Sequence, residues 1–175
     1  MNINASRRNF IRGLAGTSAF AVGGCMCPRG EQKIKLAVVG VMGKGYSDWT
    51  PMLQSGKVEI VAFCDCDYTK RHDAQMRLVR DGIDFDMYRV PFYTDYRKLL
   101  DNAGVLGVEA MTISTPDHVH APVAIKAMRQ GIHIFIQKPL VRTLWELDYF
   151  GRTAKENGVV VQMGNQGSAL DSMRR

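Results

Sequence analysis

Short apolar runs alternate with amphipathic stretches along most of this chain. Buried strands are predicted for the apolar runs at residues 33–39, 58–64, 108–114, 132–136 and 159–163, with a short extended piece near 89–93. Helices are predicted between them, at residues 46–55, 69–80, 95–102, 121–130 and 144–157. Continuous apolar runs of this length are typical of strands buried on both faces of a parallel sheet. The alternation therefore predicts an α/β fold, a Rossmann-like doubly wound parallel sheet with right-handed crossovers.

A glycine-rich turn follows the first predicted strand. Residues 40–45 read Gly-Val-Met-Gly-Lys-Gly, which approaches the G-x-G-x-x-G fingerprint of dinucleotide-binding folds except that methionine replaces the middle glycine. Such a turn presents free backbone amides at the start of a helix, where a pyrophosphate can bind. Cofactor contacts are therefore predicted at Gly40, Met42, Gly43, Lys44 and Gly45. A glycine turn that binds no ligand is the structural alternative.

An acidic side chain ends the second predicted strand. Asp65 lies 25 positions after Gly40, close to the separation of about 20 that places a carboxylate beside the adenosine ribose hydroxyls. A carboxylate accepts hydrogen bonds from these hydroxyls and repels a 2′-phosphate, so the cofactor is predicted to be NAD, with NADP as the alternative. Lys70 and Arg71 nearby would soften that preference. Asp67 is interpreted as a helix cap or turn residue.

Three further motifs follow the later predicted strands. Residues 114–122 read Ser-Thr-Pro-Asp-His-Val-His-Ala-Pro, residues 137–140 read Gln-Lys-Pro-Leu, and residues 164–167 read Gly-Asn-Gln-Gly. With the glycine turn and Asp65, these motifs resemble the glucose-fructose oxidoreductase / inositol dehydrogenase (Gfo/Idh/MocA) family over residues 33–175. The resemblance implies a nicotinamide-dependent oxidoreductase whose small-molecule substrate is a sugar, a polyol or a related hydroxyl compound.

The resemblance also assigns roles to residues at these strand ends. It implies cofactor contacts at Ser114, Thr115, Pro116, His120, Gln137 and Lys138. The family's Glu-Lys-Pro signature places its lysine, here Lys138, near substrate and nicotinamide, although Gln137 stands where glutamate is usual. An amine against a carbinol oxygen can stabilise developing alkoxide or relay its proton, so Lys138 is the predicted catalytic residue.

The two histidines after the fourth strand also admit a metal interpretation. His118 and His120 lie two positions apart, and no third ligand is evident in the sequence, so no metal site is predicted. His120 is predicted to contact the cofactor groove, with His118 facing solvent. Cys64 is interpreted as a small core hydrophobe.

The first 30 residues have the features of an export signal. Arg7 and Arg8 precede a weakly apolar stretch of small residues at 13–24, which resembles a twin-arginine signal and predicts export to the periplasm by that machinery. Cys25 is a candidate for lipid anchoring. A disordered basic arm is the alternative interpretation of this segment.

The net positive charge of the chain does not indicate binding to a polyanionic partner. The formal net charge is +6, from 23 basic and 17 acidic residues. Arg7, Arg8 and Arg12 supply half of it, and no cluster of basic and aromatic residues remains elsewhere, so no nucleic-acid binding is predicted.

The length limits the number of domains. The 175 residues divide into an export signal and linker (1–30), an NAD(P)-binding Rossmann domain (31–167) and the start of a connection (168–175) to the C-terminal substrate domain that the family has and this chain lacks. We expect this chain alone to bind cofactor weakly and to catalyse nothing, because half a pocket cannot position substrate. The full-length protein is expected to be a homo-oligomer.

Three alternative functions stay open from the sequence. The chain could be a non-catalytic nucleotide-binding or interaction module. It could also belong to a family member that uses NAD transiently to cleave glycosidic bonds. A transferase that binds a methyl donor shares the glycine turn and the acid after the second strand, but the Gln-Lys-Pro strand end argues against it.

Overall fold

The structure, a computed structural model, describes residues 32–165. Their strands form one sheet in the order β3-β2-β1-β4-β5-β6, in which every neighbouring pair is parallel. The strands are β1 (Ile34–Val39), β2 (Val58–Cys64), β3 (Phe92–Tyr93), β4 (Ala110–Ile113), β5 (His133–Gln137) and β6 (Val161–Gly164). The predicted α/β fold with a doubly wound parallel sheet is confirmed. The predicted export signal at 1–30, with Cys25, and the segment 168–175 lie outside the described residues and stay predictions.

Helices connect the strands as crossovers. They are α2 (Lys44–Gln54), α3 (Thr69–Arg80), the short 3-10 helix η2 (Met87–Arg89), α4 (Tyr96–Asp101), α5 (Ala103–Leu106), α6 (Asp117–Met128) and α7 (Leu144–Glu156). The bounds of β2 and α3 match the prediction. Helix α6 begins four residues before the predicted start, because Pro116 adopts extended backbone at its N-cap and Asp117 already lies in the first turn.

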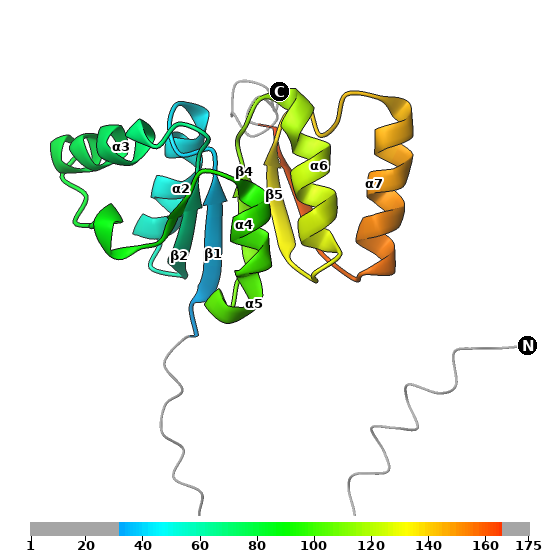
Figure 1. Ribbon diagram of the computed structural model, residues 1–175, viewed down its shortest axis with the longest axis horizontal. Coiled ribbons are helices and arrows are strands. Elements are labelled where there is room, and N and C mark those ends of the chain that lie inside the picture. The colour runs from blue at the N-terminus through cyan, green and yellow to red at the C-terminus, as the bar shows by residue number, and fades with distance from the viewer. Residues whose placement is uncertain (1–31, 166–175) are drawn as a thin grey trace, which may run out of the picture. The chain divides into compact units, whose positions relative to one another are not determined.

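Two apolar clusters fill the two faces of the sheet. On one face, α2 and α3 pack Trp49 and Leu78 against Leu36 and Val38 of β1. On the other face, α4 to α7 pack against the alternate strand residues, among them Val39 and Ile113. Figure 1 shows this arrangement, with α4 to α7 together on one side of the sheet. The strands alternate their side chains between the two layers, as strands buried on both faces must.

The chain order reverses between β1 and β4. Strand β2 lies on one side of β1, whereas β4, later in the sequence, lies on the other. The last four residues of β1 are all buried, so the turn that follows this strand starts from the centre of the molecule. In open α/β sheets the crevice at such a switch point is where ligands bind.

Candidate functional site

The glycine turn between β1 and α2 approaches other backbone segments too closely for a side chain. A Cβ on Gly40, whose φ is +86°, would overlap the carbonyl oxygen of Ser114. A Cβ on Gly45 would overlap the carbonyl oxygen of Gly40, whereas Gly43 has open space but a φ of +60°. Gly40 and Gly45 therefore let β4 and α2 close onto the turn, and Gly43 supplies a left-handed backbone conformation.

Asp65 holds this turn from the end of β2. Its Oδ2 accepts a hydrogen bond of 3.0 Å from the backbone N–H of Val41, and its Oδ1 accepts one of 3.2 Å from that of Asp67. A carboxylate has about four acceptor positions, so two remain for hydroxyl groups. Asp67 is a turn residue, as predicted, because its Oδ1 accepts from the backbone N–H and the hydroxyl of Thr69.

The two basic residues after Asp65 point in different directions. Lys70 lines the larger cavity described below and forms ion pairs with Asp73 at 2.9 Å and Asp67 at 3.4 Å, and these partners raise the pKa of its ammonium. Arg71 donates to the backbone carbonyls of Met87 and Val90, both at 3.1 Å. Of these two basic residues, Lys70 is therefore the one that could contact a ligand in this cavity.

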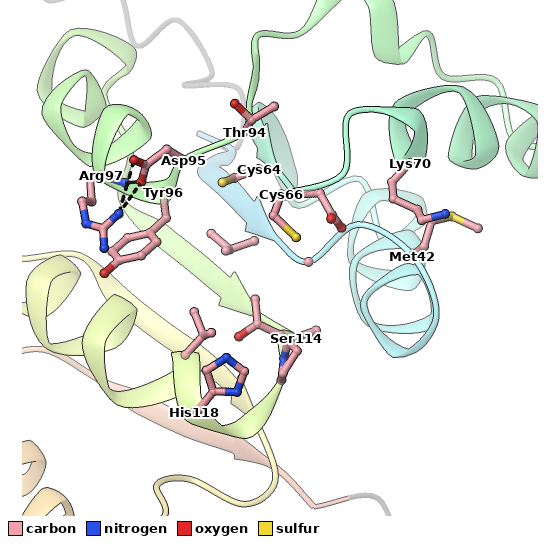
Figure 2. A pocket seen from close by; sticks show the side chains of 16 residues that line it. Met42, Cys64, Cys66, Lys70, Thr94, Asp95, Tyr96, Arg97, Ser114 and His118 are labelled. Carbon is pink, nitrogen blue, oxygen red and sulfur yellow. Dashed lines mark hydrogen bonds and ion pairs between the residues drawn. The ribbon is translucent and has the colours of Figure 1, made fainter.

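The larger of two cavities, of about 700 Å³, opens at the carboxyl ends of β1 to β4. Figure 2 shows its lining side chains coming from four strand ends: Met42 after β1, Cys64 and Cys66 at β2, Thr94 to Arg97 after β3, and Ser114 and His118 after β4. Gly40, Asp65, Lys70, Thr115 and Pro116 complete its polar and turn residues. An elongated ligand can therefore contact the glycine turn and Asp65 together.

A second cavity, of about 330 Å³, lies beside the ends of β4 and β5. It is lined by Lys44, Ser114, Thr115, Gln137 and Lys138. Ser114 and Thr115 belong to both cavities. The hydroxyl oxygen of Thr115 is buried and has no hydrogen-bond partner among residues 32–165. Buried polar atoms are usually paired, so this hydroxyl is one of a few exceptions among these residues.

A buried carboxylate that the sequence analysis missed joins these strand ends. Asp48 in α2 accepts hydrogen bonds on Oδ2 from Ser114 Oγ at 2.8 Å and from Gln137 Nε2 at 2.9 Å. Its Oδ1 is paired with the ammonium of Lys44, one helical turn earlier. The signal for it was an acidic residue three positions after Gly45, on the buried face of the helix that follows the glycine turn.

The two histidines after β4 differ in burial. His120 is 1% exposed and lies beneath the site, with Nδ1 2.7 Å from the carbonyl oxygen of Pro139 and Nε2 2.9 Å from that of Thr115. His118 is exposed and lines the larger cavity. This geometry gives His120 a positioning role between the β4 and β5 ends, and a direct contact with cofactor stays a prediction for it.

The two described cysteines flank Asp65. Cys64 is buried in β2, where burial, with smaller contributions from Asp65 and Asp95, raises the pKa of its thiol to about 12. This agrees with the interpretation of Cys64 as a core residue. Cys66 is exposed and also lines the larger cavity. The residues after β3, Thr94 to Arg97, were missed by the sequence analysis, although they too follow a strand directly.

The arrangement fits a dinucleotide. Gly40 and Gly45 leave no room for side chains, Asp65 keeps two acceptor positions, and Ser114 and Thr115 line both cavities. In residues 32–165, His, Cys, Asp and Glu form no group of three able to hold a metal ion. None of the helices within that range is both long enough and apolar enough to cross a membrane.

Comparison with known proteins finds relatives that are named as glycosyl hydrolases and as dehydrogenases. A glycosyl hydrolase family 109 protein of Akkermansia muciniphila is 32% identical over 130 residues, which are 72% of this chain and 26% of that protein. The scyllo-inositol 2-dehydrogenase (NAD(+)) of Bacillus subtilis is 40% identical over 58 residues, 33% of this chain and 17% of the enzyme. The chain therefore spans about a third or less of the length of these relatives.

A solved structure agrees in fold. The scyllo-inositol dehydrogenase of Lactobacillus casei with bound NAD(H) and scyllo-inositol superposes with a TM-score of 0.67 at 19% identity, over 82% of this chain and 39% of that one. The family model described as "Oxidoreductase family, NAD-binding Rossmann fold" matches residues 34–165. The chain belongs to this family, Gfo/Idh/MocA, and its described residues form the family's NAD-binding domain.

Proposed function

We propose that this chain is the cofactor-binding part of an exported NAD-dependent oxidoreductase that acts on a sugar, a polyol or a related hydroxyl compound. The observation that carries the proposal is the pair of adjoining cavities. They share Ser114 and Thr115, with Asp65 in one and Lys138 in the other. A dinucleotide that spans both would meet a ribose-binding acid at one end and a free amine at the other.

The chain's own groups divide the work of binding and chemistry. When bound, NAD supplies hydride acceptance at its nicotinamide. Asp65 offers two acceptor positions to ribose hydroxyls, and the glycine turn leads into the start of α2, where negative charge is favoured. Lys138 is exposed at the end of β5 in the smaller cavity. There its ammonium form can stabilise an alkoxide oxygen, and its neutral amine form can accept the hydroxyl proton.

The arrangement after β2 favours NAD over NADP. A 2′-phosphate would lie against the Asp65 carboxylate, which is repulsive. Lys70 could offset this charge, but two aspartates already pair with it. Arg71 is directed to backbone carbonyls near η2. Neither Lys70 nor Arg71 therefore offers an unpaired positive charge to a 2′-phosphate.

A second candidate reaction is redox-assisted cleavage of a glycosidic bond. The glycosyl hydrolase family 109 relative supports it, because that protein matches 72% of this chain. Both reactions need NAD bound in the same way. They differ in what happens to the substrate afterwards, which depends on the rest of a full-length protein.

Export and assembly are proposals that rest on the sequence. The twin arginines and the small-residue stretch in 1–30 support passage to the periplasm by the twin-arginine machinery, with Cys25 as a lipid-attachment candidate. A homo-oligomer is proposed for the full-length protein.

Titration of the 175-residue chain with NADH and NADPH tests the proposal. We expect weak saturable binding, with NADH bound at least about tenfold more tightly, a difference of ~1.4 kcal/mol. Lys138→Ala is expected to abolish turnover in the full-length enzyme, with a much smaller effect on NADH binding. Failure of the wild-type chain to bind NADH, or equal affinity for both dinucleotides, would contradict the proposal.

A further inference from the structure

Asp48 is a buried carboxylate surrounded by hydrogen-bond donors. Its side chain is 5% exposed, and three side chains donate to its two oxygens: Lys44 from the same helix, Ser114 from the end of β4 and Gln137 from the end of β5. The last two lie 66 and 89 residues away in sequence. Charge-assisted hydrogen bonds of this kind are stronger than neutral ones, so they fix the positions of their donors.

The donors that meet at Asp48 are residues of the smaller cavity. Lys44, Ser114 and Gln137 are three of the five residues that line it, and the other two, Thr115 and Lys138, are their direct chain neighbours. Asp48 itself does not line the cavity. One carboxylate beneath the cavity thus orients most of its wall.

Gln137 has little freedom to turn away from Asp48. It is 5% exposed, and a Cβ placed on Gly164 of the neighbouring strand β6 would overlap its Nε2. The amide is therefore confined between Gly164 and Asp48. An ionised carboxylate at position 137 would point an acceptor at an acceptor, and two carboxylates this close cannot both stay ionised.

We propose that Asp48 is a positioning residue for the nicotinamide end of the cofactor site, and that it requires a hydrogen-bond donor at position 137. It acts on Lys138 through Gln137, by fixing the end of β5 against the end of β4 and against Lys44. This inference rests on the proposed function, because one of its two tests measures the binding of NADH. The Gln137 amide and the Asp48 carboxylate form one unit. Asp48 on α2 carries the negative charge, and Gln137 at the end of β5 donates the hydrogen bond.

An exchange of the two groups tests this unit. The variants are Gln137→Glu, Asp48→Asn and the double variant that carries both changes. Controls are Gln130→Glu and Asp148→Asn, which make the same chemical changes at exposed positions. For each variant, the unfolding midpoint in urea and the NADH dissociation constant are measured at about pH 8 and about pH 6.

The single variant Gln137→Glu is expected to suffer most. At about pH 8 its NADH affinity should fall at least about tenfold. At about pH 6 much of this loss should be recovered, because a proton shared by the two carboxyls restores a donor. The titratable groups at this point are Asp48 and Lys44, with Lys138 in the same cavity and His120 between the β4 and β5 ends. All four are also present in the wild-type chain, so the ratio to wild type at each pH isolates the new pair.

The double variant should recover the function of the pair. The amide introduced at position 48 can donate to the carboxylate introduced at position 137, so NADH affinity should return to within about threefold of wild type at both pH values. The inference is overturned if the double variant is no better than Gln137→Glu in folding or in binding, or if Gln137→Glu behaves like Gln130→Glu. Should the wild-type chain bind no NADH, the proposed function fails, while the unfolding measurements still test whether Asp48 and position 137 act as a pair.

Discussion

The glycine turn after β1 lines the larger cavity and the junction of the β4 and β5 ends lines the smaller one, and the two regions are built differently. The turn is held by backbone geometry: Gly40 and Gly45 leave no room for a side chain, and the indole N–H of Trp49 donates to the carbonyl of Val41 at 3.0 Å. The junction is held by polar side chains, with Asp48 joining Ser114 to Gln137 and His120 bridging two carbonyls.

This difference separates two ways of making a binding surface. The turn depends mainly on the absence of side chains at Gly40 and Gly45, and the side chains of Asp65 and Trp49 each bond one backbone group of Val41. The junction depends on donors and acceptors that are distant in sequence and must all be matched, since a buried polar group without its partner costs free energy. We expect the turn to fail through steric overlap and the junction through unmatched hydrogen bonds.

Replacement of a helical glycine in the turn should have the largest effect. In Gly45→Ala the new Cβ would overlap the carbonyl oxygen of Gly40, because backbone atoms cannot move aside as a flexible side chain can. We expect a loss of about 3 kcal/mol in the free energy of unfolding, measured with urea.

Gly151→Ala is the matched control for this change. Gly151 lies in the middle of α7 and has nothing within 4 Å of its Cβ position. Alanine there should stabilise the chain by roughly 0.5–1 kcal/mol, since it favours the helix. A similar result for the two variants would contradict the steric account of the turn.

Loss of the histidine bridge should have an intermediate effect. His120→Phe keeps a ring of similar shape but removes the two ring nitrogens that lie 2.9 Å and 2.7 Å from the carbonyl oxygens of Thr115 and Pro139. We expect unfolding to become easier by about 2 kcal/mol and NADH binding to weaken, because both loops line or adjoin the site. The same substitution at the exposed His118 should change the urea midpoint little, and equal losses for both would argue against a bridge.

Alkylation of the cysteines should have the smallest effect and should distinguish the strand from the groove. Burial raises the pKa of Cys64 to about 12, so at neutral pH its thiol stays protonated and unreactive, and its ionisation would favour unfolding only as the pH rises above the ordinary thiol range. Cys66 is exposed in the larger cavity. Of the two cysteines in residues 32–165, iodoacetamide should modify Cys66 and not Cys64, and NADH should slow the reaction.

Fragment-ion mass spectrometry is needed to read this result, because residues 58–70 leave trypsin as one peptide that contains both cysteines. Modification of Cys64 in the folded chain, or a rate for Cys66 that NADH does not change, would contradict the placement of these two side chains.

Local patterns predicted much of this site. The apolar runs predicted the strands along the chain, and the rule that ligands meet strand ends directed attention to Gly40, Asp65, Ser114 and Lys138, which line the two cavities. The same rule applied to β3 would have found Thr94 and Asp95. The sequence marks the end of β3 poorly, because this strand has only two residues and no long apolar run.

Other features needed the folded chain. Arg71 and Lys70 are neighbours in sequence, yet only Lys70 lines the cavity, because helix geometry turns successive side chains about 100° apart. His118 and His120 separate in the same way at the start of α6, one into the cavity and one beneath it.

The sequence by itself determined the α/β architecture and the positions of the strand-end motifs, because hydrophobic periodicity and glycine turns are local properties of the chain. Only the tertiary structure decided which polar groups face one another. Asp48 looks in sequence like an ordinary acidic residue of an amphipathic helix, with Lys44 four positions before it as a surface ion-pair partner. The packing of α2 against β4 and β5 buries this carboxylate among three donors, and it is this burial that makes the identity of residue 137 matter.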